Sequence, residues 1–197
     1  MVYLKKKNQP HLESQDEMQL EKAEQKLKNS HLKSILNPVE FLKKITLFSD
    51  LKENEEALAF FYSFMKDRRF RCGQDIFVEG EAGAELFLLL SGEAEVFRKT
   101  LEGDQYKIAV LKSSQGVFFG EGGLLEAEAR TATICAVEES HCLVLSRKEF
   151  IEIAKIHPEW AFPVLMRISR AVLHRMRKTN QDMILLYEAL ISEIRGK

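Results

Sequence analysis

The sequence predicts a mainly β fold: an antiparallel eight-stranded jelly roll (a double-stranded β-helix) with N-terminal helices and a long C-terminal helix. Nine of the ten glycines lie between Gly73 and Gly123, while residues 1–72 and 124–195 contain none. Glycine favours tight turns and weakens helix interiors. The middle of the chain is therefore rich in turns and lies between two glycine-free arms. Residues 69–145, which include this glycine-rich middle, carry eight short strand-like segments, most of them with no helical periodicity between them.

Composition excludes several classes of protein. The 197 residues include 29 lysines and arginines against 30 acidic residues, so the net charge of −1 gives no general case for nucleic-acid binding. The longest apolar run, Ala57–Tyr62, is far below the roughly 20 residues that span a bilayer. No signal peptide is visible at the N-terminus. Three cysteines without a CxxC pair (Cys72, Cys135 and Cys142) indicate reduced thiols, so we expect a cytoplasmic protein.

The chain divides into three predicted parts. Residues 1–37 form a charged helical arm, which is either a solvated helix, the favoured interpretation, or a helix that packs on a partner protomer. Residues 38–158 form the β-roll domain with its flanking helices. Residues 159–197 form a C-terminal helix that acts as a lid and as a dimerisation element.

Capping signals place the flanking helices. Asn37-Pro38-Val39-Glu40 has the capping-box arrangement and predicts a helix over 39–48, followed by a second over 55–67. A second capping box at Ser146–Glu149 opens a helix to about Ile156. The strands between them are predicted at Arg69–Cys72, Asp75–Glu79, Glu85–Leu90, Ala94–Lys99, Tyr106–Leu111, Val117–Phe119, Arg130–Val137 and Cys142–Leu145.

A long helix is predicted from Pro158 onward. A mostly apolar stripe follows the helical repeat over four heptads, with steps of three or four residues after a first step of seven, at Leu165, Val172, Met176, Thr179, Met183, Leu186, Leu190 and Ile194. Such a narrow seam is typical of a helix that pairs with its symmetry mate. The alternative is that the helix only lies along its own barrel; its length favours a homodimer.

The most informative segment is residues 119–133, called the cassette below. It places Gly120, Gly122 and Gly123 at the end of a strand, then about one turn of helix, then Arg130. Free backbone N–H groups and an arginine fork both attract a phosphate. The carboxylate of Glu121 cannot favour an anion, so a sugar hydroxyl is its natural partner. Phosphate and ribose together indicate a nucleotide.

The cassette resembles the phosphate-binding cassette of the cyclic nucleotide-binding domain family, the β-roll of catabolite activators and of protein kinase A regulatory subunits. The matching positions are Phe119, Gly120, Glu121, Leu124, Arg130, Thr131 and Ala132. Upstream, the glycine turns at Gly80, Gly83 and Gly92 also resemble the family. Downstream, residues 165–169 look like the start of the C-helix in the catabolite-activator branch. The resemblance covers about residue 37 to the C-terminus.

The resemblance implies a role for each matching residue. Arg130 would pair with the cyclic phosphate, and Glu121 would accept from the ribose 2′-OH. Thr131 would bond phosphate or base, and Val96 would line the pocket. Arg175, Thr179 and Asn180 would close over the base as a lid. The complete predicted site is Val96, Gly120, Glu121, Gly122, Gly123, Leu124, Arg130, Thr131, Ala132, Arg175, Thr179 and Asn180.

Two positions depart from the family pattern. Gly122 stands where an aliphatic residue is usual, so we expect a looser cassette in the absence of ligand. Ala84 replaces a frequent acidic residue, with an expected effect on the turn alone. Neither departure touches Arg130 or Glu121.

The expected function is that of a non-catalytic sensor of cAMP or cGMP, with no cofactor and no metal ligands. Only a short tail follows Asn180, so we expect no helix-turn-helix, no direct nucleic-acid binding and signalling through an unknown protein partner or the dimer; no membrane association is expected. One alternative is a scaffold with a vestigial pocket. The other, a metal-dependent cupin-type enzyme, is disfavoured because the five histidines include no HxH pair. Thr131 leaves cAMP and cGMP both open, and the resemblance of the C-helix favours cAMP.

Overall fold

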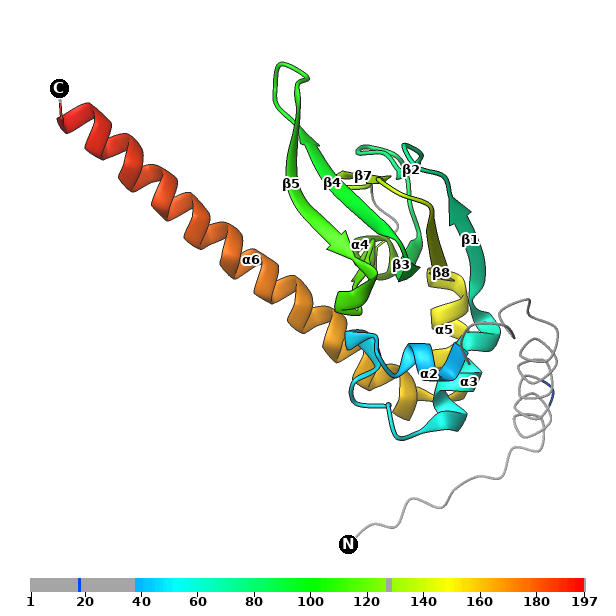
Figure 1. The fold of residues 1–197 in the computed structure, drawn as a ribbon. Helices are drawn as coiled ribbons and strands as arrows, with labels where there is room; N and C mark the ends of the chain where they lie inside the picture. Colours follow the sequence, from blue (N-terminus) through cyan, green and yellow to red (C-terminus); the bar gives the residue numbers. More distant parts are fainter. Residues whose placement is uncertain (1–17, 19–37, 127–128, 197) are drawn as a thin grey trace, which may run out of the picture.

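A computed structural model describes residue 18 and residues 38–126 and 129–196. The eight strands form two four-stranded antiparallel sheets, with strand orders β1-β8-β3-β6 and β2-β7-β4-β5 (Figure 1). The predicted mainly β fold with flanking helices is confirmed. The strands are β1 (Lys66–Phe70), β2 (Asp75–Phe77), β3 (Glu85–Ser91), β4 (Glu93–Lys99), β5 (Gln105–Lys112), β6 (Phe118–Phe119), β7 (Thr133–Ala136) and β8 (Ser140–Ser146).

Most of the helices gather at one end of the sheets, whereas the long C-terminal helix α6 begins there and runs out away from them, and α4 lies within the cassette (Figure 1). The capping box predicted at Ser146 is present, since its hydroxyl accepts from the Glu149 backbone and the Glu149 carboxylate accepts from the Ser146 backbone. The helices are α2 (Pro38–Leu42), η2 (Thr46–Phe48), α3 (Glu55–Phe64), η3 (Ser113–Gln115), α4 (Glu121–Leu125), α5 (Arg147–Ile156) and α6 (Pro158–Arg195). The predicted arm over 1–37 and the Asn37 cap lie outside the described residues.

The prediction of one continuous helix over 39–48 is wrong. The chain is helical in α2, turns, and becomes helical again only in the short η2. Ile45, between them, is extended and buried, and the backbone N–H of Thr46 donates to the carbonyl of Gly116 at 3.1 Å. Burial of Ile45 and this long-range hydrogen bond outweigh the local helical pattern.

Several other boundaries differ from the prediction, and two of these differences have a clear structural cause. The helix predicted to Asp67 ends at Phe64, because residues 66–70 pair with β8 instead. The strand predicted from Arg130 begins only at Thr133. Before it, Arg130 is held to the loop of residues 80–81: its N–H donates to the Glu81 carbonyl at 2.7 Å, and its carbonyl accepts from Gly80 at 2.8 Å. This backbone pairing fixes Arg130 ahead of the strand.

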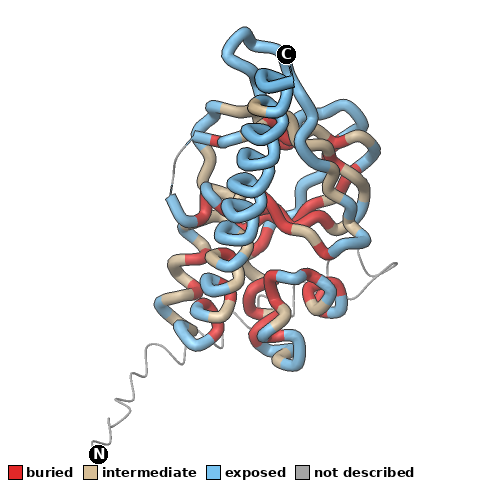
Figure 2. Tube along the Cα trace, turned by 90° about the vertical axis from the view of Figure 1, so that its left-hand side faces the viewer, coloured by how far each residue is buried: buried red, intermediate tan, exposed pale blue. Residues whose placement is uncertain are grey.

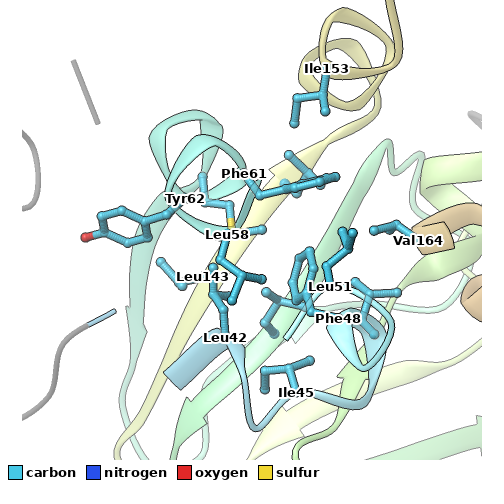
Figure 3. Packing of buried hydrophobic residues seen from close by; sticks show 14 of the residues in the cluster. Leu42, Ile45, Phe48, Leu51, Leu58, Phe61, Tyr62, Leu143, Ile153 and Val164 are labelled. Atoms are coloured by element: carbon cyan, nitrogen blue, oxygen red, sulfur yellow. The ribbon is translucent and has the colours of Figure 1, made fainter. Parts of the chain in front are cut away.

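Two apolar clusters support the fold. The larger one joins the helices to one sheet, and Figure 3 shows Phe48, Leu58, Phe61, Leu143 and Val164 meeting within it. The smaller one fills the space between the sheets and includes Phe70, Ile76, Phe87, Leu89, Ala94, Phe119, Ile134, Ala136, Cys142 and Val144. The site described below lies against this second cluster.

Helix α6 changes character along its length. Trp160, Ala161, Val164 and Ile168 are buried, whereas every residue from Val172 to Gly196 except the half-buried Ile191 is exposed (Figure 2). The packed part is also tied by a two-hydrogen-bond ion pair between Arg167 and Asp50, at 2.7 and 2.5 Å. The outer part has no apolar cover from its own chain in the described region. Over the described residues, no helix has the length and apolar character needed to cross a membrane.

Candidate functional site

Arg130 is the centre of the site. It is only 6% exposed, and its Nη1 donates to the backbone carbonyls of Glu85 at 2.9 Å and Gly120 at 3.2 Å. Nε is buried and has no hydrogen-bond partner among the residues described. Since both hydrogen bonds use Nη1, the Nε–Nη2 edge of the fork makes none to this part of the chain. That edge has the geometry that binds two oxygens of a phosphate or carboxylate.

The carboxylates nearest to Arg130 are bonded elsewhere. Glu85 accepts two hydrogen bonds from Arg68, at 3.1 and 2.5 Å, and Glu121 accepts from Nη1 of Arg175. Glu81 accepts from the backbone N–H of Val78 at 3.1 Å. Within the described residues, no carboxylate oxygen hydrogen-bonds the Arg130 guanidinium.

Arg130 is therefore a buried cation whose positive charge is balanced only by carboxylates that do not hydrogen-bond it. Burial lowers the pKa of its guanidinium below the ordinary value, although the charges of Glu85, Glu121 and Glu81 act to raise it. An arginine nevertheless stays protonated in proteins. A desolvated cation without a hydrogen-bonded counter-charge favours an external anion.

Three glycines surround this guanidinium. A Cβ atom on Gly83 would lie 2.1 Å from Nε, and one on Gly120 or Gly123 would lie 2.9 or 2.8 Å from Nη1. Gly120 also has a φ of +76°, which favours glycine. We call Gly83, Gly120 and Gly123 the glycine cluster. The concentration of glycine in this part of the sequence serves close approach to Arg130 as well as turns.

The two neighbouring glycines of α4 differ in the space available for a Cβ atom, and this difference predicts opposite effects on stability. A Cβ on Gly123 would meet the Gly83 carbonyl oxygen at 2.6 Å, whereas one on Gly122 would meet nothing within 4 Å. Gly123→Ala is expected to lower the free energy of unfolding by about 1–3 kcal/mol through overpacking. Gly122→Ala is expected to raise it by about 0.4–1 kcal/mol. Urea denaturation of both variants checks the pair; equal effects of the two substitutions would contradict it.

Glu121 links the cassette to α6. It is 9% exposed, and its carboxylate accepts a hydrogen bond from Arg175, a residue 54 positions further along the chain. Of the predicted lid residues, the structure thus brings Arg175 to the cassette through Glu121. Thr179 and Asn180 are exposed on α6, and no hydrogen bond joins either to the described part of the cassette.

The remaining predicted residues fall into two groups. Gly123 and Leu124 are buried in α4, and the half-buried Val96 packs against the cluster between the sheets. Gly122 and Thr131 are exposed, and Ala132 is half-buried. Sequence reasoning missed the role of Gly83 and of Phe77, whose ring centroid lies 4.2 Å from Cζ of Arg130. Gly83 did carry a signal, as one of the glycine turns, but nothing in the sequence pairs it with Arg130.

The fold and the buried arginine together define a β-roll with a candidate anion-binding site, and comparison with known proteins gives the family. Residues 67–157 match the model of the cyclic nucleotide-binding domain. The chain therefore contains a domain of this family, with the site residues of the cassette inside the matched region.

Relatives agree with this assignment. The chain is 31% identical over 145 residues to the cyclic AMP receptor protein of Thermus thermophilus, covering 74% of this chain and 63% of that protein. It is 32% identical over 120 residues to cGMP-dependent protein kinase, isozyme 1, of Drosophila melanogaster, covering 60% of this chain and 15% of the kinase. The crystal structure of Thermus thermophilus catabolite activator protein superposes with a TM-score of 0.64 at 29% identity, covering 72% and 63% of the two chains. The chain thus spans less than two thirds of each of these relatives.

Proposed function

We propose that the protein is a non-catalytic sensor that binds cAMP or cGMP, with the cyclic phosphate on the Nε–Nη2 edge of Arg130. The observation that carries this proposal is a buried guanidinium whose neighbouring carboxylates are bonded elsewhere. The cyclic phosphate carries a single negative charge and would supply the hydrogen-bonded counter-charge of the Arg130 guanidinium. Relatives named for cyclic AMP and for cGMP support both nucleotides, and the exposed Thr131 in the cassette is compatible with either.

Glu121 is proposed to accept a hydrogen bond from the ribose 2′-OH. Its carboxylate is held in place by Arg175, so one oxygen is already oriented when a ligand arrives. Glu121→Ala is expected to weaken binding by about 1–3 kcal/mol, the cost of losing one hydrogen-bonded polar group. Calorimetric titration checks this with the 2′-deoxy nucleotide as the control. The assignment fails if Glu121→Ala weakens the 2′-deoxy ligand as strongly as the ribose ligand.

Signalling is proposed to pass through α6. Arg175 contacts the cassette at Glu121, and Arg167 holds the root of the same helix to Asp50. A nucleotide that engages Arg130 and Glu121 changes the surroundings of Arg175. Closure of Thr179 and Asn180 over the base would then shift the population of α6 positions.

The outer part of α6 is proposed to form a homodimer. Its predicted seam is exposed in the single chain, including Met183 at 62%, Leu186 at 72% and Leu190 at 53%. A second copy with the same seam would cover these side chains in a two-stranded coiled coil. A protein partner that is not yet known is proposed to bind the protein and transmit the signal. The protein is proposed to act in the cytoplasm, without direct contact with nucleic acid or a membrane.

A matched pair of variants tests the dimer. Leu186→Glu places a charge in the seam and is expected to raise the dimer dissociation constant at least about tenfold. Leu185→Glu, one residue earlier and outside the seam, is expected to leave it unchanged. Sedimentation equilibrium measures both. The coiled-coil proposal is overturned if the unaltered protein is a monomer or if both variants stay dimeric.

Calorimetric titration with cAMP and cGMP side by side tests the proposed function. Saturable one-to-one heat with at least one of them is the expected result. No heat and no thermal shift with either nucleotide would favour the alternative, an interaction scaffold with a vestigial pocket.

A further inference from the structure

Two phenylalanine rings lie under the Arg130 guanidinium. The Cζ atom is 4.2 Å from the ring centroid of Phe77 and 5.6 Å from that of Phe87. Both distances fall within the roughly 6 Å over which a cation and an aromatic face attract each other. Desolvation strengthens this attraction, and Arg130 is buried.

The backbone of β2 aims Phe77 at this position. In a regular strand, adjacent residues point to opposite faces. Here the pairing of β2 with β7 shifts register between Asp75 and Phe77, so that Asp75 faces Cys135 and Phe77 faces Ile134. Ile76 and Phe77 consequently pack against the same apolar cluster between the sheets. Such irregularities commonly redirect a side chain.

An aromatic ring holds a guanidinium in a way that a carboxylate cannot. A carboxylate would take the N–H groups of the fork and cancel the positive charge. A ring face attracts the cation and leaves every N–H group free. This distinction matters at Arg130, whose Nε–Nη2 edge has no hydrogen-bond partner among the described residues.

We propose that Phe77 is a positioning residue: its ring face fixes the Arg130 guanidinium by a cation–π contact and leaves the Nε–Nη2 edge without hydrogen bonds to the described residues, so that this edge can bind the ligand phosphate. The identity of that ligand rests on the function proposed above. The contact between Phe77 and Arg130 is independent of it, so the two can be tested separately.

Stepwise fluorination of Phe77 tests the contact in the ligand-free protein. Incorporation of 4-fluoro-, 3,5-difluoro- and 3,4,5-trifluorophenylalanine withdraws charge from the ring face and changes its shape little. In the protein with Arg130, the unfolding equilibrium constant is expected to rise with each step, reaching about three- to tenfold for the trifluoro ring. In the Arg130→Met background, the same series is expected to be flat.

Phe119 provides the matched control. It belongs to the same apolar cluster and stacks on Phe87, with ring centroids 5.4 Å apart, and no cationic side chain of the described residues lies over its ring. Fluorination of Phe119 is expected to change the unfolding equilibrium constant by the same amount in the protein with Arg130 and in the Arg130→Met background. A flat Phe77 series, or one that is equally steep with Met at position 130, overturns the cation–π contact.

Nucleotide affinity gives the second readout on the same variants. The dissociation constant for the bound cyclic nucleotide is expected to rise in the order of fluorination, about threefold or more for the trifluoro ring. An affinity that stays constant while the unfolding constant changes overturns the positioning role. If the unaltered protein binds neither cAMP nor cGMP, the function proposed above fails, and the unfolding series still decides whether Phe77 holds Arg130.

Discussion

Arg130→Ala is expected to weaken cAMP or cGMP binding by about 3–5 kcal/mol, because it leaves the ligand phosphate buried without its counter-charge. This corresponds to at least about a hundredfold rise in the dissociation constant. Calorimetric titration of the variant measures the change. The expected loss is larger than for any other single substitution at the site, since Arg130 is the one cation that the cassette itself brings to the glycine cluster.

The ligand-free protein is expected to respond differently. Arg130 makes hydrogen bonds to two backbone carbonyls and none to a described carboxylate, so its removal deletes a desolvated charge along with those bonds. The free energy of unfolding is therefore expected to change by no more than about 2 kcal/mol. Arg69→Ala, at an exposed arginine of β1, serves as the control and should bind normally. An Arg130→Ala protein that binds within threefold of the unaltered protein would show that the cassette assignment is wrong.

Gly83→Ala is expected to reduce affinity at least about tenfold and to lower the free energy of unfolding by no more than Arg130→Ala does, about 2 kcal/mol at most. Its Cβ would lie 2.1 Å from Nε and 2.4 Å from Cζ of Arg130, on the side of the fork proposed for phosphate. The atoms displaced are the end of a flexible side chain, so the fold can accommodate the methyl group, whereas the guanidinium must leave its position. Loss of one charge-assisted interaction of this kind is worth roughly 1.5–3 kcal/mol.

Gly122→Ala is the control for this second prediction. It introduces the same methyl group in the cassette at a place with no neighbour within 4 Å. Thermal denaturation and calorimetry on both variants separate stability from binding. Unchanged affinity in Gly83→Ala, or an equal loss in Gly122→Ala, would contradict a role for the glycine cluster in keeping the fork open.

Local patterns were sufficient to predict most of the fold. Turn residues and strand-like composition gave all eight strands, and the Ser146 capping box located α5 because both of its hydrogen bonds lie within four residues. The break in the helix predicted over 39–48 could not be foreseen from local patterns. It depends on the burial of Ile45 and on a hydrogen bond from Thr46 to Gly116, a contact between distant parts of the chain.

The same contrast between local patterns and contacts across the chain applies to the site. Arg130 and Glu121 belong to one short motif, so the motif was sufficient to single them out, and the structure buries both. The proximity of Gly83 and Phe77 to Arg130 depends on how β2 and the following loop meet the cassette. The contact between Arg175 and Glu121 depends on the direction that α6 takes after its buried turns. Neither relationship has a local sequence signal.

The Nε–H resonance of Arg130 provides the most direct test of phosphate binding at this arginine. Nε is buried without a hydrogen-bond partner among the described residues, so a phosphate on the Nε–Nη2 edge would give it one. In ¹H–¹⁵N spectra, with the Arg130 signal assigned by its loss in Arg130→Lys, saturation with cAMP or cGMP is expected to shift this resonance. Absence of binding by both nucleotides, or binding that leaves the Arg130 Nε–H resonance unmoved, would contradict the proposed site.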